Sequence, residues 1–232
     1  MDKSSFGIGL VGPAAYVIKI GDKKIAVDIS MRKLPGEEES TALLREFLSD
    51  FDVAIVTHNH YDHCDLPLLG SIPESVLCLI PDFIPNELKN KVETSHGFKF
   101  TVGEAEIEFF ESHHSRLTNI VPEYGFAITY KGETYVFPTD VRTYEGDFPK
   151  FKNVKILFSH LWFLDALNLY DNPYIEKFTN YVKGFGAEKV CVAHLNDVRR
   201  PIDQMWSDMH FNAVKDAIPN SQMFTLGNWI EL

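Results

Sequence analysis

Short apolar runs separated by turn signals fill the first part of the chain. Gly21-Asp22 is a turn signal between two such runs, so it predicts a hairpin near the N-terminus. The run Val53-Ala54-Ile55-Val56 is typical of a buried strand. Helical spacing of apolar residues predicts a helix over 41–49, and a proline suited to a first helical turn predicts another over 85–92. The strands expected in this part cover residues 7–11, 16–20, 23–28 and 53–56.

From residue 99 onward, predicted strands come first and then alternate with helices. One helix is expected over 175–183, where Gly184 ends the pattern, and another over 202–217, which ends before Pro219. No repeat, low-complexity segment or linker rich in proline and glycine divides the chain. We therefore expect one domain over residues 1–232, built from two sheets with outer helices. The strands expected in this part cover residues 99–102, 107–111, 126–130, 134–138, 154–158, 190–193, 223–226 and 228–231.

Composition narrows the class of protein without naming a function. The 232 residues include 22 Lys+Arg and 33 Asp+Glu, a formal net charge of −11, which argues against a nucleic-acid-binding protein. The three cysteines are widely spaced and form no CxxC pair, so neither a thiolate zinc site nor a disulfide framework is expected. The first residues lack the apolar core of a secretory signal, and no long apolar run predicts a membrane span. A cytoplasmic protein is expected.

The segment from Thr57 to His63 carries the strongest chemical signal. It reads Thr-His-Asn-His-Tyr-Asp-His and directly follows a predicted strand, where a buried strand reaches a loop. Three imidazoles and one carboxylate so close together match neither a helix face nor an alternating strand. A loop can instead direct all four groups at one small volume, and imidazole with carboxylate suits zinc and similar metals. The candidate ligands of this segment are His58, His60, Asp62 and His63.

More residues of metal-binding types follow later predicted strands. His113 and His114, then Asp140, and then His194 each come shortly after such a strand. Loops at strand ends are where a rigid scaffold usually positions functional side chains. Each of these residues alone would more often be structural. Counting one of the two adjacent histidines, they and the four residues of the first segment supply seven candidate ligands, which is enough for two metal ions.

The order of these residues resembles that of the metallo-β-lactamase superfamily. The pattern HxHxDH, then His, then Asp, then His runs through nearly the whole chain, and Asp28 resembles the strand-end aspartate that precedes the motif in that superfamily. The resemblance implies an α/β fold, a four-layer αβ/βα sandwich of two mixed sheets flanked by helices, with a dinuclear metal site at the sheet edge. Asp28 would accept a hydrogen bond from a ligand imidazole. The implied ligands are His58, His60 and His113 for one ion, Asp62, His63 and His194 for the other, and Asp140 bridging the two.

Which of the adjacent residues His113 and His114 is the metal ligand depends on which face of the preceding strand leads to it. The stretch from His113 to Arg116 resembles one in the branch near N-acylphosphatidylethanolamine phospholipase D and ascorbate-6-phosphate lactonase, and this favours His113 as the ligand. Side chains alternate along a strand, so the face that holds Ile107 and Phe109 also leads to His113. His114 would then line the pocket or support a ligand.

A site of this kind implies a hydrolase. Two divalent ions can share a bridging hydroxide, because coordination lowers the pKa of water to about 7, and they polarise the oxygen that gains charge. The expected reaction cleaves an ester-type bond, preferably a phosphodiester or a lactone, in a small-molecule substrate. Zinc is the first expectation for the metal, with manganese or iron as alternatives. The competing interpretation is a metal-binding protein of the same fold with a redox or sensing role.

Several residues could act beside the metal ions. Asp62 could take part in proton transfer next to the bridging position. His160 follows a predicted core strand, and it could contact the substrate or donate a proton to the leaving group; a structural hydrogen bond near the strand end is the alternative. Arg116, Arg199 and Arg200 are candidates for binding an anionic substrate group, with surface ion pairs as the alternative.

Overall fold

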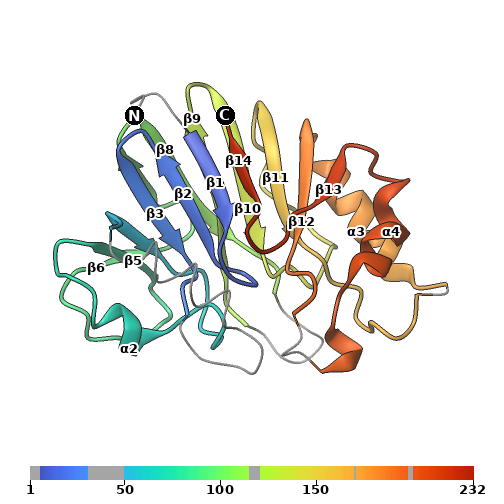
Figure 1. Ribbon diagram of the computed structural model, residues 1–232, viewed down its shortest axis with the longest axis horizontal. Helices are drawn as coiled ribbons and strands as arrows, with labels where there is room; N and C mark the ends of the chain where they lie inside the picture. Colours follow the sequence, from blue (N-terminus) through green and yellow to red (C-terminus); the bar gives the residue numbers. More distant parts are fainter. Residues whose placement is uncertain (1–5, 31–49, 115–120, 170, 198–200) are drawn as a thin grey trace. The chain divides into compact units, whose positions relative to one another are not determined.

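Two mixed sheets of seven strands each organise the chain (Figure 1). The computed structural model describes residues 6–30, 50–114, 121–169, 171–197 and 201–232. The chain divides into two units, which are described separately: unit 1 comprises residues 1–109 with 226–232, and unit 2 comprises residues 110–225. Two mixed sheets together with helices confirm the expected α/β class. The expectation of a single domain over the whole chain stays a prediction.

The first sheet, in unit 1, has the strand order β14-β1-β2-β3-β4-β5-β6. The pairs from β14 to β3 are antiparallel, and those from β3 to β6 are parallel. Parallel strands end at one edge of a sheet, so the residues after β3 and β4 become neighbours: the Asp28 N–H donates to Ile55 O at 2.8 Å. The elements are β1 (Phe6–Leu10), β2 (Tyr16–Ile20), β3 (Lys23–Val27), β4 (Val53–Ile55), α2 (Leu66–Leu69), β5 (Leu77–Pro81), β6 (Lys91–Thr94) and β14 (Trp229–Glu231).

The second sheet has the strand order β13-β12-β11-β10-β9-β8-β7. β9 and β10 are antiparallel, whereas β10, β11, β12 and β13 are parallel. Three phenylalanines stack across β9, β10 and β11, since the ring centroids of Phe126 and Phe137, and those of Phe137 and Phe158, lie 4.6 Å apart. The strands are β7 (Lys99–Val102), β8 (Ala105–Glu111), β9 (Tyr124–Tyr130), β10 (Glu133–Thr139), β11 (Val154–His160), β12 (Lys189–Ala193) and β13 (Ser221–Met223).

Helices α3 (Pro173–Gly184) and α4 (Asp208–Lys215) lie beside the β12–β13 end of the second sheet (Figure 1). The side chain of Asn172 caps α3 by accepting the Tyr174 N–H, and Phe178 and Val182 bury its apolar face in the core of unit 2. A short 3₁₀ turn, η1 (Ile202–Gln204), precedes α4. Among the described helices, none combines the length and the apolar composition needed to cross a membrane.

One helix prediction is wrong, one is confirmed only in part, and a third lies outside the described residues. Residues 85–92 form no helix, because asparagine side chains bind the backbone there and residues 91–94 join the sheet as β6. The helix expected over 202–217 is broken into η1 and α4, since Ser207 and His210 form a capping box that starts α4 afresh. The helix expected over 41–49 falls among residues that the structure does not describe.

Gly125, in β9, is a position where the fold leaves no room for a side chain. A Cβ atom there would lie 2.7 Å from the Phe110 ring and 2.8 Å from the backbone oxygen of Phe137. We expect Gly125→Ala to lower the free energy of unfolding by about 1–3 kcal/mol, because a backbone oxygen within a sheet cannot move aside. Gly184→Ala is the matched control, since a Cβ at Gly184 meets no atom within 4 Å. Urea titrations that show equal stabilities for the two variants would contradict this expectation.

Candidate metal centre

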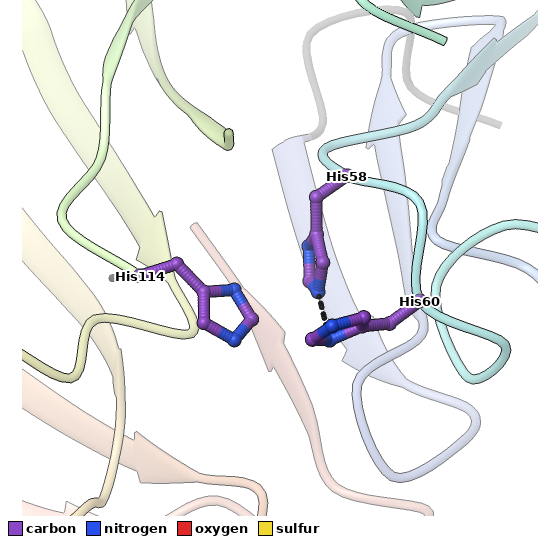
Figure 2. Close-up of side chains that lie close together, drawn as sticks. All are labelled: His58, His60 and His114. Atoms are coloured by element: carbon purple, nitrogen blue, oxygen red, sulfur yellow. Dashed lines mark hydrogen bonds between the residues drawn. The ribbon is translucent and has the colours of Figure 1, made fainter. Parts of the chain in front are cut away.

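The imidazoles of the first segment turn toward one another after β4. His58 is fully buried, and its Nε2 lies 3.0 Å from Nδ1 of His60 (Figure 2). The ring centroids of His58 and His63 lie 4.0 Å apart. Nitrogen ligands of a tetrahedral zinc ion are roughly 3.3 Å apart when each lies about 2.0–2.1 Å from the metal. His58 and His60 therefore present two nitrogens close to the spacing that one such ion requires.

Asp28 holds this segment in place from the end of β3. Its Oδ1 accepts the backbone N–H of Thr57, and its Oδ2 accepts the Thr57 hydroxyl, both at 2.8 Å. Oδ2 also lies 2.8 Å from Nδ1 of His63, so Asp28 accepts a hydrogen bond from an imidazole as expected. A proton fixed on Nδ1 leaves Nε2 of His63 as the nitrogen with a lone pair for a metal. This Nε2 lies 3.9 Å from Oδ2 of Asp62, the other candidate ligand of the segment.

Unit 2 contributes its own group of donors at the ends of three parallel strands. Asp140 follows β10, His160 ends β11 and His194 follows β12, and all three are buried. One potential ligand atom from each of the three lies within 4.8 Å of the others. A cavity of about 10 Å³, lined by these residues together with Arg142 and Trp162, leaves room for about one water-sized particle.

The distances within this group distinguish residues that fit as metal ligands from a residue that orients a ligand. Nδ1 of His160 lies 2.6 Å from Oδ1 of Asp140, which is a hydrogen-bond distance and shorter than the roughly 3.3 Å between two ligands of one tetrahedral ion. Nε2 of His194 lies 3.8 Å from the same oxygen, which leaves room for an ion in contact with both. Asp140 and His194 therefore fit a shared metal, and His160 orients Asp140. The role of His160 as a proton donor stays a prediction.

The two adjacent histidines after β8 have different surroundings. His114 is fully buried, and its Nδ1 lies 2.6 Å from Oε2 of Glu123. The ring of His113 is only half-buried and packs edge-on against Phe148, with the centroids 4.8 Å apart. An imidazole whose Nδ1 faces a buried carboxylate has its Nε2 set for metal binding. Figure 2 draws the imidazole of His114. His63 has the same arrangement, with its Nδ1 against a carboxylate oxygen of Asp28.

Nothing in the sequence pattern singles out Glu123, since a lone acidic residue before a strand is common. Its position supplies the usable signal: β9 runs antiparallel to β10, so the residue before β9 lies at the edge where β10 ends. Oε1 of Glu123 accepts the backbone N–H of Asp140 at 2.8 Å. One buried carboxylate thus contacts both a candidate ligand imidazole and the backbone of Asp140.

Backbone conformation at the strand ends is unusual. Asp28, Thr139 and His194 have φ angles of 51°, 66° and 60°, although none of them is glycine. Left-handed backbone is most unfavourable for the β-branched Thr139, whereas aspartate and histidine adopt it more readily. Two of these residues belong to the predicted site, and the third directly precedes Asp140.

Burial keeps two tyrosine hydroxyls and two cysteine thiols neutral. Burial raises the pKa of the Tyr144 and Tyr181 hydroxyls well above its ordinary value, and the charges of Asp140 and Glu123 respectively raise it further. Burial also raises the pKa of the Cys78 thiol to about 11 and that of Cys191 to about 12, so both thiols are poor metal ligands at neutral pH. Arg116, Arg199 and Arg200 lie outside the described residues.

Comparison with known proteins agrees with this geometry. A family model described as "Beta-lactamase superfamily domain" matches residues 30–194. No curated protein matches the sequence. Among solved structures, the metallo-beta-lactamase fold protein YhfI from Bacillus subtilis has a TM-score of 0.65 at 16% identity, with 99% of this chain and 100% of that chain covered.

Two further solved structures have the same fold and are named for different reactions. An isothiocyanate hydrolase from Delia radicum gut bacteria has a TM-score of 0.64 at 14% identity over 97% of this chain and 98% of its own. CmlA, a diiron beta-hydroxylase from Streptomyces venezuelae, has a TM-score of 0.67 at 14% identity over 100% of this chain and 54% of its own. The matched family model, which spans most of the chain and all seven predicted ligands, places this protein in the beta-lactamase superfamily, and its fold is the metallo-β-lactamase fold.

Proposed function

We propose that this protein is a metal-dependent hydrolase that cleaves an ester-type bond at a dinuclear site. The observation that carries the proposal is the donor group of unit 2, where Asp140 and His194 approach each other at a ligand-like distance at the ends of parallel strands. Divalent ions bound there would activate water as a nucleophile and polarise a carbonyl or phosphoryl oxygen. An isothiocyanate hydrolase of the same fold supports hydrolysis as the reaction class.

The side chains divide into ligands and residues that orient them. We assign His58, His60, Asp62 and His63 in unit 1, and Asp140 and His194 in unit 2, as ligands. For the remaining ligand the sequence predicts His113, but the burial of His114 and its contact with Glu123 favour His114. Asp28, Glu123 and His160 act through these ligands, because each places a hydrogen-bonding atom against one of them.

Metal dependence is tested by removing metal with a chelator and then reloading separate samples with zinc, manganese or iron(II). We expect about two ions per chain by atomic spectroscopy, and turnover that appears only after reloading. The substrate panel is bis(p-nitrophenyl) phosphate, a lactone and a thioester, since an ester-type bond is common to all three. Turnover of the phosphodiester or the lactone would match the preferred substrate classes.

Two outcomes would contradict the proposal. Binding of fewer than about one ion per chain after loading would exclude a dinuclear site. Binding of two ions without turnover on any ester-type substrate, combined with oxygen consumption by the iron-loaded protein, would favour a redox role. Asp216→Ala is the control for metal or activity lost while a variant is purified and reloaded, since Asp216 is an exposed residue at the end of α4.

A further inference from the structure

A second cavity lies in unit 2, between residues 144–150 and helix α3. Its volume is about 280 Å³, and four aromatic residues line it: Tyr144, Phe148, Tyr181 and Phe185. A cavity of about 150 Å³ is enough to hold benzene. The space therefore fits a group of one or two rings, and it lies just below the usual size range of small-molecule pockets.

The aromatic rings of the cavity wall pack against one another and carry no charge. Tyr181 lies at its centre, with ring centroids 4.5 Å from Phe148, 5.2 Å from Phe185 and 5.2 Å from Tyr144. The hydroxyl of Tyr144 donates to the backbone oxygen of Trp162 at 2.9 Å, so its polar end is already engaged elsewhere. Both phenols remain protonated, because burial raises their pKa. A neutral ring suits such a wall, since aromatic rings attract one another edge-to-face or when offset.

Apart from the two tyrosines, the polar side chains that line the cavity lie at its exposed rim. Asp147, Lys150 and Asn180 line the cavity and are exposed to solvent. The aspartate and the lysine carry opposite charges, so the rim offers no net charge that would select an anion or a cation. The chemistry of the cavity therefore favours a neutral aromatic group over an ionised one.

The cavity shares a wall with the strand end that carries the candidate ligand histidines. Phe148, on the cavity wall, packs against the ring of His113. Gly146, also on the wall, lies so close that a Cβ atom there would be 3.7 Å from Cε1 of His113. The backbone oxygen of His113 accepts the N–H groups of Arg142 and Thr143, which fixes the segment that leads into the wall. Phe148 and Gly146 would therefore be the residues that separate a ring in the cavity from the imidazole of His113.

We propose that this cavity binds a neutral aryl group of the substrate, so that the ester-type substrate of the proposed site carries one or two aromatic rings. The assignment to a substrate rests on the proposed hydrolase function, whereas binding of an aryl group to the cavity does not. Contacts with a remote, non-reacting group of this kind serve to position the reacting bond.

Gly184, the last residue of α3, offers a way to fill the cavity without disturbing the fold. It lines the cavity, and a Cβ atom there meets no atom within 4 Å. Asn180 lines the cavity one turn earlier on the same helix face, and its exposed side chain can also be enlarged. Gly184→Trp and Asn180→Trp are therefore the blocking variants, and Gly184→Ala is the matched control.

The test has one readout for binding and one for turnover. Binding of 2-naphthol, measured by ligand-observed NMR and titration, should weaken by about tenfold or more in both blocking variants and stay unchanged in Gly184→Ala. In the metal-loaded enzyme, the ratio of kcat/KM for 2-naphthyl acetate to that for ethyl acetate should fall by about the same factor.

The outcomes separate this inference from the proposed function. Equal naphthol affinity in the wild type and both blocking variants, or no binding to the wild type, would overturn the cavity assignment even if esters are hydrolysed. An unchanged substrate ratio with weakened naphthol binding would overturn the assignment of the cavity to the substrate. Blockable naphthol binding without turnover of any ester would leave the aryl site standing and remove the hydrolase function.

Discussion

Replacing Asp28 by asparagine is expected to lower metal affinity about 10–100-fold while leaving the fold intact. The amide oxygen of asparagine can still accept the Thr57 N–H, which now bonds Oδ1 of Asp28 at 2.8 Å. The amide nitrogen then faces Nδ1 of His63, where the carboxylate oxygen now lies. A donor at that position forces the imidazole proton onto Nε2 and so blocks the nitrogen needed for the metal.

The backbone conformation at Asp28 accepts asparagine without added strain. Its φ angle of 51° lies in the left-handed region, which asparagine tolerates at least as well as aspartate. We therefore expect a thermal midpoint near that of the wild type, together with weakened zinc binding in competition with a chromophoric chelator. Asp216→Asn is the control for the loss of one negative charge. Unchanged affinity in Asp28→Asn would mean that His63 is not a ligand.

The strands that carry the candidate site are those that the sequence predicts best. β4, β10, β11 and β12 are apolar runs with buried residues, and each leads directly into a ligand-type residue or ends in one. Burial on both faces makes such parallel strands easy to recognise from composition. Because β10, β11 and β12 are parallel, they end at the same edge of the sheet. This pairing alone brings together Asp140, which follows β10, and His194, which follows β12.

The elements that the sequence misses depend on contacts from distant segments. β6 has only one fully buried residue, and its pairing with β5 creates the strand rather than any apolar alternation. The register argument for His113 fails to decide the ligand because β8 ends at Glu111, so alternation along the strand does not extend to residue 113. Glu123 becomes visible only once β9 is known to start where β10 ends.

Glu123→Gln provides the second test of how the imidazoles are oriented, and it also decides between the two adjacent histidines. Oε1 of Glu123 accepts the Asp140 N–H, so the oxygen of glutamine should keep that place and its amide nitrogen should face His114. The donated hydrogen bond would move the His114 proton to Nε2. If His114 is a ligand, metal affinity should fall about 10–100-fold with little change in the thermal midpoint.

A double-mutant cycle with His114 makes the assignment of Glu123 specific. In a His114→Ala background, Glu123→Gln should have no further effect on metal affinity, because the imidazole through which it acts is gone. In a His113→Ala background the full effect should remain, since the His113 ring packs against Phe148 rather than against the carboxylate. The reverse pattern would restore His113 as the ligand, the residue that strand alternation predicts. Equal losses of metal affinity in both backgrounds would instead mean that Glu123 acts through Asp140, whose backbone N–H it accepts.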